Sequence, residues 1–312
     1  MLENSSNNNR KNSDTLWHYC SCAAFFSILE KGVIRINDIT KSNDREELRL
    51  LLDSCSKKLT EKTSWTGRAF TIFLAFIKNL FEEDTLIKTY EEASDKISLD
   101  NETKKSFELI TKDINKKIWS FSFSKKGDDL NMWRAYGDDG FGISIGFKKT
   151  YFDNLLKDLS EKHQICAKLF DVEYCSEAPS KNRDEFIDKV ISIVKDSNLT
   201  EEEKNEKYSL LRNDFVMNAA RYKNFCFKDE EEVRLVIFGE GIKVDNLIFE
   251  KFLEKNNKFI SFLNLQIDFF EAIDFIYLGP KNPNNTSDVK RMLDFKLPNH
   301  SIDIIHSEIP YV

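Results

Sequence analysis

Residues 118–124 read IWSFSFS, and from Trp119 onward aromatic and serine side chains alternate without interruption. Successive side chains of a β-strand point to opposite faces, so this stretch predicts a strand with one aromatic face and one face of hydroxyls. A loop rich in Gly and Asp follows, and residues 142–147, GISIGF, return to strand character. The centre of the chain is therefore predicted to be a β-rich core.

Further strands are predicted on both sides of this centre, with helical segments between them. They are expected at residues 16–21, 33–36, 169–174, 233–238, 274–278 and 302–305. Strands scattered singly among long helices favour an α+β fold with a mixed or antiparallel sheet over a doubly wound sheet. Neither GxGxxG after a strand nor GxxxxGK[ST] occurs, which argues against a Rossmann or P-loop nucleotide site.

The domain organisation follows from the same segments. Residues 1–14 form a polar Asn- and Ser-rich run and are predicted to be a flexible tail. Residues 15–312 are predicted to form a single α+β domain. Two stretches with helical spacing, at about 46–117 and 150–222, are interpreted as helical insertions into that domain.

Composition excludes several classes of protein. The chain has 312 residues with a hydrophobic fraction of 41%, including 26 Phe, so it can fill a core and is not disordered. It carries 46 Lys and Arg against 53 Asp and Glu, a formal charge of -7. This balance argues against a protein that wraps duplex DNA through its net charge, because phosphate neutralisation requires clustered basic residues.

Cysteine and histidine placement indicates a cytoplasmic protein without structural metal. The six Cys are scattered and no secretory signal precedes them, which predicts reduced thiols in the cytoplasm. His163, His300 and His306 do not supply a pair at metal-ligand spacing. The apolar run at residues 69–77, AFTIFLAFI, is far shorter than the roughly 20 residues a membrane span requires, so it predicts a buried helix and no membrane partner.

Aromatic and hydroxyl side chains form the first two candidate groups. His18 and Tyr19 lie at the end of the first predicted strand, where a histidine is also compatible with a core position. Ser122 and Ser124 share one strand face, and hydroxyls in a row can position ribose or amide groups. A half-buried strand with its small polar face toward solvent explains the same pattern. Trp133 and Tyr136, one helical turn apart, could close an aromatic wall over that face. 

A run of charges forms the third candidate group. The sequence from Glu230 to Arg234 is EEEVR and opens an apolar strand. Period-two geometry predicts Glu230, Glu232 and Arg234 on one face. Two neighbouring carboxylates repel each other when both are ionised, so their pKa values differ. One of them can then act as an acid and the other as a base or as an electrostatic group. A solvated charge run at a strand entry is the alternative interpretation.

Several motifs, in this order along the chain, resemble those of the bacterial domain-of-unknown-function family 2971. They are His18-Tyr-x-Ser21, Asn43-Asp-x-x-Glu47, Ser122-Phe-Ser124, Met132-Trp-x-x-Tyr136, Gly142-x-x-x-Gly146-Phe147, Lys223, Phe227, Glu230-x-Glu232-x-Arg234 and Tyr277-Leu-Gly279-Pro280. Arg45 and Phe227 stand where the family usually has Pro and often has Trp, respectively. More remotely, the layout is similar to the ADP-ribosyltransferase superfamily, whose split sheet binds NAD in a cleft.

The resemblance implies an enzyme that uses NAD as a substrate. Glu232 and Glu230 are implied as the catalytic pair, with Glu232 bound to the ribose 2′-hydroxyl and Glu230 orienting or deprotonating the acceptor. The remaining side chains are implied to bind NAD: His18 near the adenosine, Tyr19 beside it in sequence, Ser122 and Ser124 at the nicotinamide ribose, Trp133 or Tyr136 stacked on nicotinamide, and Arg234 beside Glu230 or the pyrophosphate.

The expected function is therefore cleavage of NAD at the nicotinamide–ribose bond and transfer of ADP-ribose to an acceptor, in bacterial stress or anti-phage defence. The acceptor could be protein, nucleic acid or a small molecule. Two alternatives stay open. One is a non-catalytic binding module. The other is a metal-dependent nuclease or phosphoesterase in which Glu230, Glu232 and Asp44 or Glu47 coordinate Mg²⁺.

Overall fold

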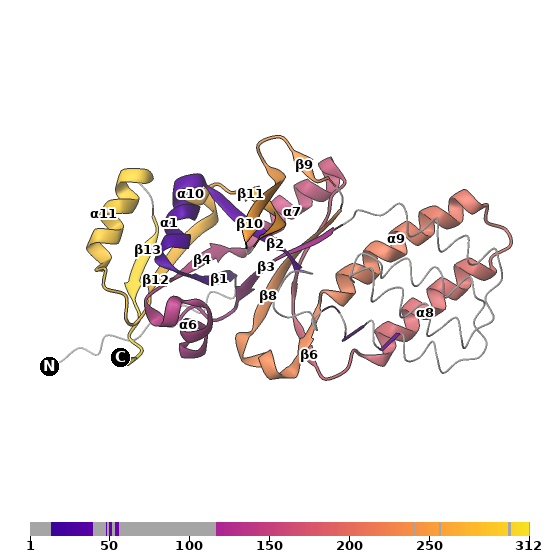
Figure 1. The fold of residues 1–312 in the computed structure, drawn as a ribbon, viewed down its shortest axis with the longest axis horizontal. Coiled ribbons are helices and arrows are strands. Elements are labelled where there is room, and N and C mark those ends of the chain that lie inside the picture. Colours follow the sequence, from indigo (N-terminus) through magenta and orange to yellow (C-terminus); the bar gives the residue numbers. More distant parts are fainter. Residues whose placement is uncertain are drawn as a thin grey trace. The chain divides into compact units, whose positions relative to one another are not determined.

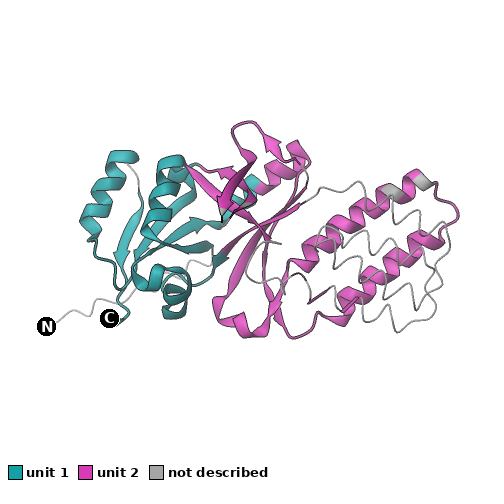
Figure 2. Cartoon of the chain, in the orientation of Figure 1, with its two compact units in different colours: residues 1–31, 123–155, 268–312 teal, residues 32–122, 156–267 magenta. Residues whose placement is uncertain are grey.

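The computed structural model describes two compact units, each assembled from segments far apart in the chain. The described residues are 14–39, 48, 50–51, 54–55, 117–239, 241–255, 257–298 and 301–311. Figure 2 shows unit 1 in teal and unit 2 in magenta. Unit 1 comprises Met1–Lys31, Phe123–Leu155 and Asp268–Val312, and unit 2 comprises Gly32–Ser122 and Leu156–Ile267.

Unit 1 is an antiparallel sheet that ends in one parallel pair of strands (Figure 1). Strand β4 pairs antiparallel with both β1 and β12, β13 pairs parallel with β12, and β1 meets the end of β3 (Lys117–Ser124) through Trp17 and Ser124. Its described elements are β1 (Thr15–Cys20), α1 (Cys22–Lys31), α6 (Leu130–Tyr136), η3 (Asp138–Gly140), β4 (Ile143–Lys148), α10 (Phe269–Ala272), β12 (Ile273–Leu278), α11 (Thr286–Lys296) and β13 (Asp303–His306).

Aromatic packing holds the β1 region of unit 1 together. The ring of Trp17 packs against Phe275 and Tyr277, with centroid distances of 5.5 and 5.3 Å. Gly146 of β4 lies opposite Trp17, and a Cβ there would lie 2.9 Å from the indole ring. A glycine is therefore required at this position, because any side chain would occupy the space that the indole fills.

Unit 2 contains a second set of strands together with the two longest helices of the described chain. Strands β2, β11, β10 and β9 pair antiparallel in that order, β2 also pairs with β3, and β8 lies between β3 and β5. Its elements are β2 (Val33–Asp38), β5 (Cys166–Asp171), β6 (Glu173–Cys175), α8 (Ser180–Lys195), α9 (Glu201–Ala219), β7 (Tyr222–Asn224), the 3-10 helix η4 (Phe225–Glu230), β8 (Glu232–Gly239), β9 (Lys243–Val244), β10 (Ile248–Lys255) and β11 (Lys258–Gln266).

Two elements, β3 and α7 (Lys149–His163), contain residues of both units. Strand β3 contributes its first six residues to unit 2 and its last two to unit 1, and α7 begins in unit 1 and ends in unit 2. The expectation of one domain over residues 15–312 stays a prediction.

The core of unit 2 forms where α8 and α9 cover one face of β8. Every residue from Glu232 to Phe238 is buried, which indicates that both faces of this strand are covered. Val236 and Phe238 belong to the same apolar cluster as Phe186 of α8 and Phe215 of α9. Helix α9 begins with a capping box in which Thr200 and Glu203 satisfy each other's backbone N–H groups.

The predicted α+β class and mixed sheet are confirmed. Strand β3 buries Trp119, Phe121 and Phe123, as its alternation predicts. The predicted insertion at 150–222 contains α7, β5, β6, α8 and α9. The β10–β11 hairpin was not predicted. The tail at 1–14 and the insertion at 46–117, with its apolar run at 69–77, lie almost entirely outside the described residues.

None of the helices in the described part of the chain combines the length and apolar character needed to span a bilayer. All six cysteines are described, and none of them forms a disulfide.

Candidate functional site

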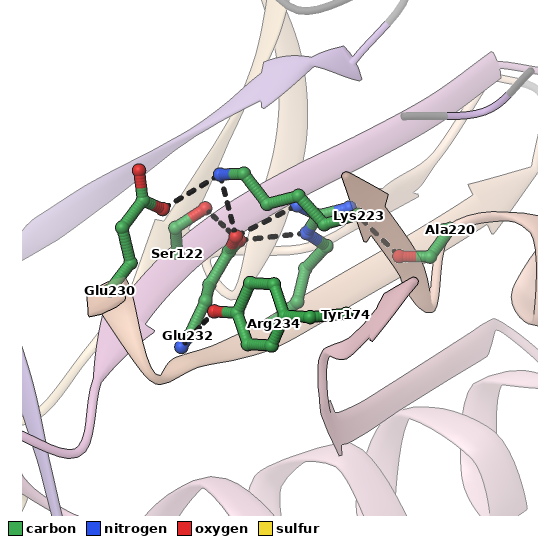
Figure 3. A network of polar contacts seen from close by, with 7 residues as sticks. All are labelled: Ser122, Tyr174, Ala220, Lys223, Glu230, Glu232 and Arg234. Carbon is green, nitrogen blue, oxygen red and sulfur yellow. Dashed lines mark hydrogen bonds and ion pairs between the residues drawn. The ribbon is translucent and has the colours of Figure 1, made fainter. Parts of the chain in front are cut away.

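A network of charged and polar side chains converges on Glu232 in unit 2 (Figure 3). Five short elements supply it: Glu232 and Arg234 come from β8, Ser122 from β3, Lys223 from β7, Tyr174 from β6 and Glu230 from η4. The strand pairing explains the convergence, because β8 lies beside β3 and β6 runs parallel to β7.

The centre of the network is a buried ion pair between Glu232 and Arg234. Their side chains are 3% and 1% exposed, and two residues of separation in a strand place them on the same face. Arg234 donates through Nε to Oε1 at 2.8 Å and through Nη2 to Oε2 at 2.9 Å, and its Nη1 donates to the carbonyl of Ala220 at 2.8 Å. This bidentate geometry fixes the position of the carboxylate.

Lys223 joins the second carboxylate to this pair. Its Nζ donates to Glu230 Oε2 at 2.7 Å and to Glu232 Oε2 at 3.1 Å, and its side chain is only 8% exposed. The ammonium also lies 4.8 Å from the ring centroid of Phe227. A single buried cation therefore brings Glu230 and Glu232 together.

Neutral groups complete the surroundings of Glu232. The hydroxyl of Ser122, an exposed residue, donates to Glu232 Oε1 at 2.6 Å. The backbone N–H of Glu232 donates to the hydroxyl of Tyr174 at 2.7 Å. A carboxylate offers about four lone-pair sites. Arg234, Lys223 and Ser122 supply four hydrogen bonds to Glu232, so its accepting capacity is filled.

The electrostatics of the network keep Glu232 ionised. Burial by itself would raise the pKa of the Glu232 carboxyl, but the charge and hydrogen bonds of Arg234, followed by Lys223 and Ser122, outweigh it and lower the pKa from 4.5 to about 2. Burial also raises the pKa of Tyr174 to about 12, so its hydroxyl stays protonated. At neutral pH the site therefore holds a fixed carboxylate anion.

This shift predicts an acid dependence of stability. Because the folded pKa of Glu232 lies below its unfolded value, the ionised group stabilises the fold above about pH 4.5, and this contribution is lost as the pH falls toward 2. It amounts to about 3 kcal/mol. Urea unfolding at pH 2 to 6 should show a steeper loss of unfolding free energy in the wild type than in Glu232→Gln. Parallel curves would contradict the assignment.

The comparison with protein families falls on the same region. Residues 132–235 match the family model described as Protein of unknown function (DUF2971). The matched segment is about a third of the chain and includes Lys223, Glu230, Glu232 and Arg234. No curated protein and no solved structure matches the chain.

The network confirms part of the predicted geometry of the DUF2971 motifs and corrects another part. Glu232 and Arg234 do lie on one strand face, and Ser122 contacts Glu232 across 110 positions of sequence. Glu230, however, is not on the strand. It ends η4, and Glu231 adopts a left-handed backbone with φ 42° before β8 begins. Lys223, rather than strand periodicity, brings Glu230 to Glu232.

The other predicted residues belong to unit 1, and two of them are core residues. Trp133 is fully buried, donates through Nε1 to Asp128 at 2.6 Å, and packs edge-on against Tyr19 at 4.8 Å. Tyr19 is 5% exposed, and its hydroxyl donates to the carbonyl of Lys126. Neither ring is open for stacking on a ligand, which corrects the expectation for Trp133 and leaves Tyr19 without a ligand-facing surface.

The remaining predicted residues of unit 1 differ in exposure. Tyr136 is 46% exposed. Ser124 is buried and accepts a hydrogen bond from the backbone of Lys126 at 3.0 Å. His18 is half-buried on β1, opposite Ile145 of β4.

Lys223 and Tyr174 belong to the network but are not among the site residues that the sequence predicted. Lys223 occurs among the DUF2971 motifs, but a lone lysine carries no period or spacing that indicates a partner. Tyr174 reaches the site because β6 pairs with β7, a contact between three-residue strands. Such short strands leave little pattern in a sequence.

Metal binding is the alternative role that the sequence allows for the same carboxylates. In the parts of the chain that the structure describes, no three His, Cys, Asp or Glu side chains are grouped as metal ligands. Asp44 and Glu47 lie outside the described residues. Glu230 and Glu232 already face the cations of Lys223 and Arg234.

Proposed function

We propose that this chain is an ADP-ribosyltransferase-like enzyme, which cleaves NAD at the nicotinamide–ribose bond and transfers ADP-ribose to an acceptor. The observation that carries the proposal is the 2.6 Å hydrogen bond from Ser122 to the buried, ionised Glu232. It joins an exposed hydroxyl on β3 to a fixed carboxylate at the start of β8, the juxtaposition that the resemblance implies. The scattered cysteines support a cytoplasmic setting, and the resemblance alone supports a role in bacterial stress or anti-phage defence.

The chemistry places different demands on the two carboxylates. As the carbon–nitrogen bond breaks, nicotinamide leaves with the bonding electrons and the ribose becomes oxocarbenium-like. Glu232, which is held in place by Arg234 and Lys223, accepts a hydrogen bond from the ribose 2′-hydroxyl without having to reorganise. The acceptor then forms a bond to the anomeric carbon, and Glu230 takes the proton that the acceptor loses.

The filled hydrogen-bonding capacity of Glu232 restricts how a substrate approaches. A ribose hydroxyl can reach this carboxylate only by replacing one of its present donors. Ser122 is the neutral donor among them and is exposed, whereas Arg234 is 1% exposed and bidentate. Ser122 thus marks the side from which a substrate reaches Glu232. The roles that the resemblance gives His18 and Tyr136 stay predictions.

A matched pair of serine variants on β3 tests this proposal. When a ribose hydroxyl takes its place on Glu232, the Ser122 hydroxyl hydrogen-bonds the nicotinamide ribose instead, so Ser122→Ala should reduce the rate of nicotinamide release from NAD about tenfold through loss of that bond. Ser120→Ala, two residues away on the same strand face, should leave the rate near the wild-type value. Nicotinamide is measured by liquid chromatography with the purified 312-residue chain. Equal rates of nicotinamide release in the two variants would show that Ser122 has no role in the mechanism.

A non-catalytic binding module is the second candidate, and the saturation of Glu232 favours it. All four of its hydrogen bonds come from the protein itself, an arrangement that also suits a purely structural ion pair. The two candidates diverge in one experiment, because wild-type protein that neither binds NAD in calorimetry nor releases nicotinamide would support the binding module. A metal-dependent nuclease is less supported, since Lys223 and Arg234 already neutralise both carboxylates.

A further inference from the structure

Lys223 is a buried cation that one surface segment covers from two positions. Helix η4 supplies both the carboxylate of Glu230, 2.7 Å from the ammonium, and the ring of Phe227, whose centroid lies 4.8 Å from it. The third neighbour, Glu232, comes from β8 at 3.1 Å. Any ligand that is to reach Lys223 from the η4 side must therefore take the place of a group that η4 provides.

The covering segment is not anchored in the core. None of the residues from Phe225 to Glu230 is buried, and Phe225 and Phe227 are 52% and 39% exposed. The segment joins β8 through Glu231, whose left-handed backbone, φ 42° and ψ 50°, is unfavourable for a residue other than glycine. A segment without buried residues that ends in a strained backbone can be displaced at a lower cost than a core element.

The two carboxylates on Lys223 are not equivalent. Glu232 is also bound by Arg234 and Ser122, and its side chain is 3% exposed. Glu230 has 17% of its side chain exposed and belongs to η4, which has no buried residue. The Lys223–Glu230 contact is consequently the one that an incoming anion can exchange while the buried pair stays intact.

We propose that Lys223 binds a phosphate group of a ligand, and that the carboxylate of Glu230 occupies the place of that phosphate when no ligand is bound. A phosphate oxygen carries negative charge and accepts hydrogen bonds from an ammonium, as a carboxylate oxygen does. Exchange therefore preserves the charge balance of the network. In NAD the group is the pyrophosphate, and its binding releases Glu230 to accept the acceptor's proton. This last link rests on the proposed function, whereas phosphate binding itself does not.

Calorimetry with inorganic pyrophosphate and with ADP-ribose tests the proposal without any turnover. Glu230→Gln removes the competing charge and should bind both probes about tenfold more tightly than wild type, the scale of one charge-assisted hydrogen bond. Glu231→Gln is the matched control, since it makes the same charge change at the exposed neighbouring residue and should bind like wild type.

A double variant, Lys223→Met with Glu230→Gln, should not show the tenfold increase in affinity for the two probes that Glu230→Gln shows alone. It is expected to fold because Glu232 keeps Arg234 and Ser122 as partners. Equal affinities of wild type and Glu230→Gln for both probes, an equal gain in Glu231→Gln, or tight binding by the double variant would each overturn the proposal. A gain for ADP-ribose alone would support it and assign the phosphate to a nucleotide. If pyrophosphate binding follows the predicted pattern but NAD is not cleaved, the proposed enzyme activity fails and this inference stands.

Discussion

Replacing Arg234 with alanine is expected to lower the free energy of unfolding by about 3–5 kcal/mol, because it leaves a buried carboxylate without its main partner. Glu232 is 3% exposed and would lose two of its four hydrogen bonds. The carbonyl of Ala220 would also lose the N–H that binds it at 2.8 Å. Urea unfolding of the purified chain at pH 7 measures this change.

Arg221→Ala provides the matched control for this variant. Arg221 belongs to the same unit and lies 3.5 Å from Glu173, but the two side chains are 38% and 48% exposed. An exposed pair of this kind contributes about 0–1 kcal/mol. If the two arginine variants unfold at the same urea concentration, burial does not determine the strength of the Glu232–Arg234 pair.

A double replacement separates the unpaired charge from lost packing. Glu232→Leu combined with Arg234→Met removes both charges while retaining side-chain volume, and such replacements of buried ion pairs are often nearly neutral. The double variant should therefore be more stable than Arg234→Ala alone. A double variant as unstable as the single one would show that the rest of the network, including the Lys223 contact to Glu232, depends on the pair.

The sequence predicted the parts of this site that depend on strand periodicity. Alternation placed Ser122 opposite the aromatic face of β3, and a spacing of two placed Glu232 and Arg234 together. Periodicity could not locate the start of β8 within a run of three glutamates. The left-handed Glu231 breaks the pattern, so Glu230 belongs to η4 rather than to the strand.

Two other features lay beyond sequence reasoning for different physical reasons. Spacing predicted Trp133 and Tyr136 on one helix face, but α6 has only seven residues, and the contact with Asp128 keeps Trp133 in the core while Tyr136 stays exposed. The β10–β11 hairpin escaped prediction because its apolar residues do not mark one buried face. Phe252 and Phe259 are 64% and 84% exposed, whereas Ile248 is fully buried.

Glu232→Gln is expected to reduce the rate of nicotinamide release by about 100- to 1000-fold if the proposed function holds, the range seen when a positioned electrostatic group is removed from an active site. Glutamine keeps the volume of the side chain but has one acceptor oxygen and an NH₂ group in place of the second. That NH₂ group must face a donor, because Arg234 and Lys223 donate to Oε2 in the wild type. Affinity for NAD, measured by calorimetry, should change much less than the rate.

The variant loses stability as well as charge, so its rate must be compared per molecule of folded protein. Circular dichroism at the assay temperature gives the folded fraction, and Glu173→Gln, on the 48% exposed carboxylate of the same unit, controls for loss of one negative charge. A folded Glu232→Gln protein that releases nicotinamide at the wild-type rate would exclude Glu232 from catalysis. Because Glu232 would then have only structural contacts, its low pKa would be explained by the buried ion pair alone.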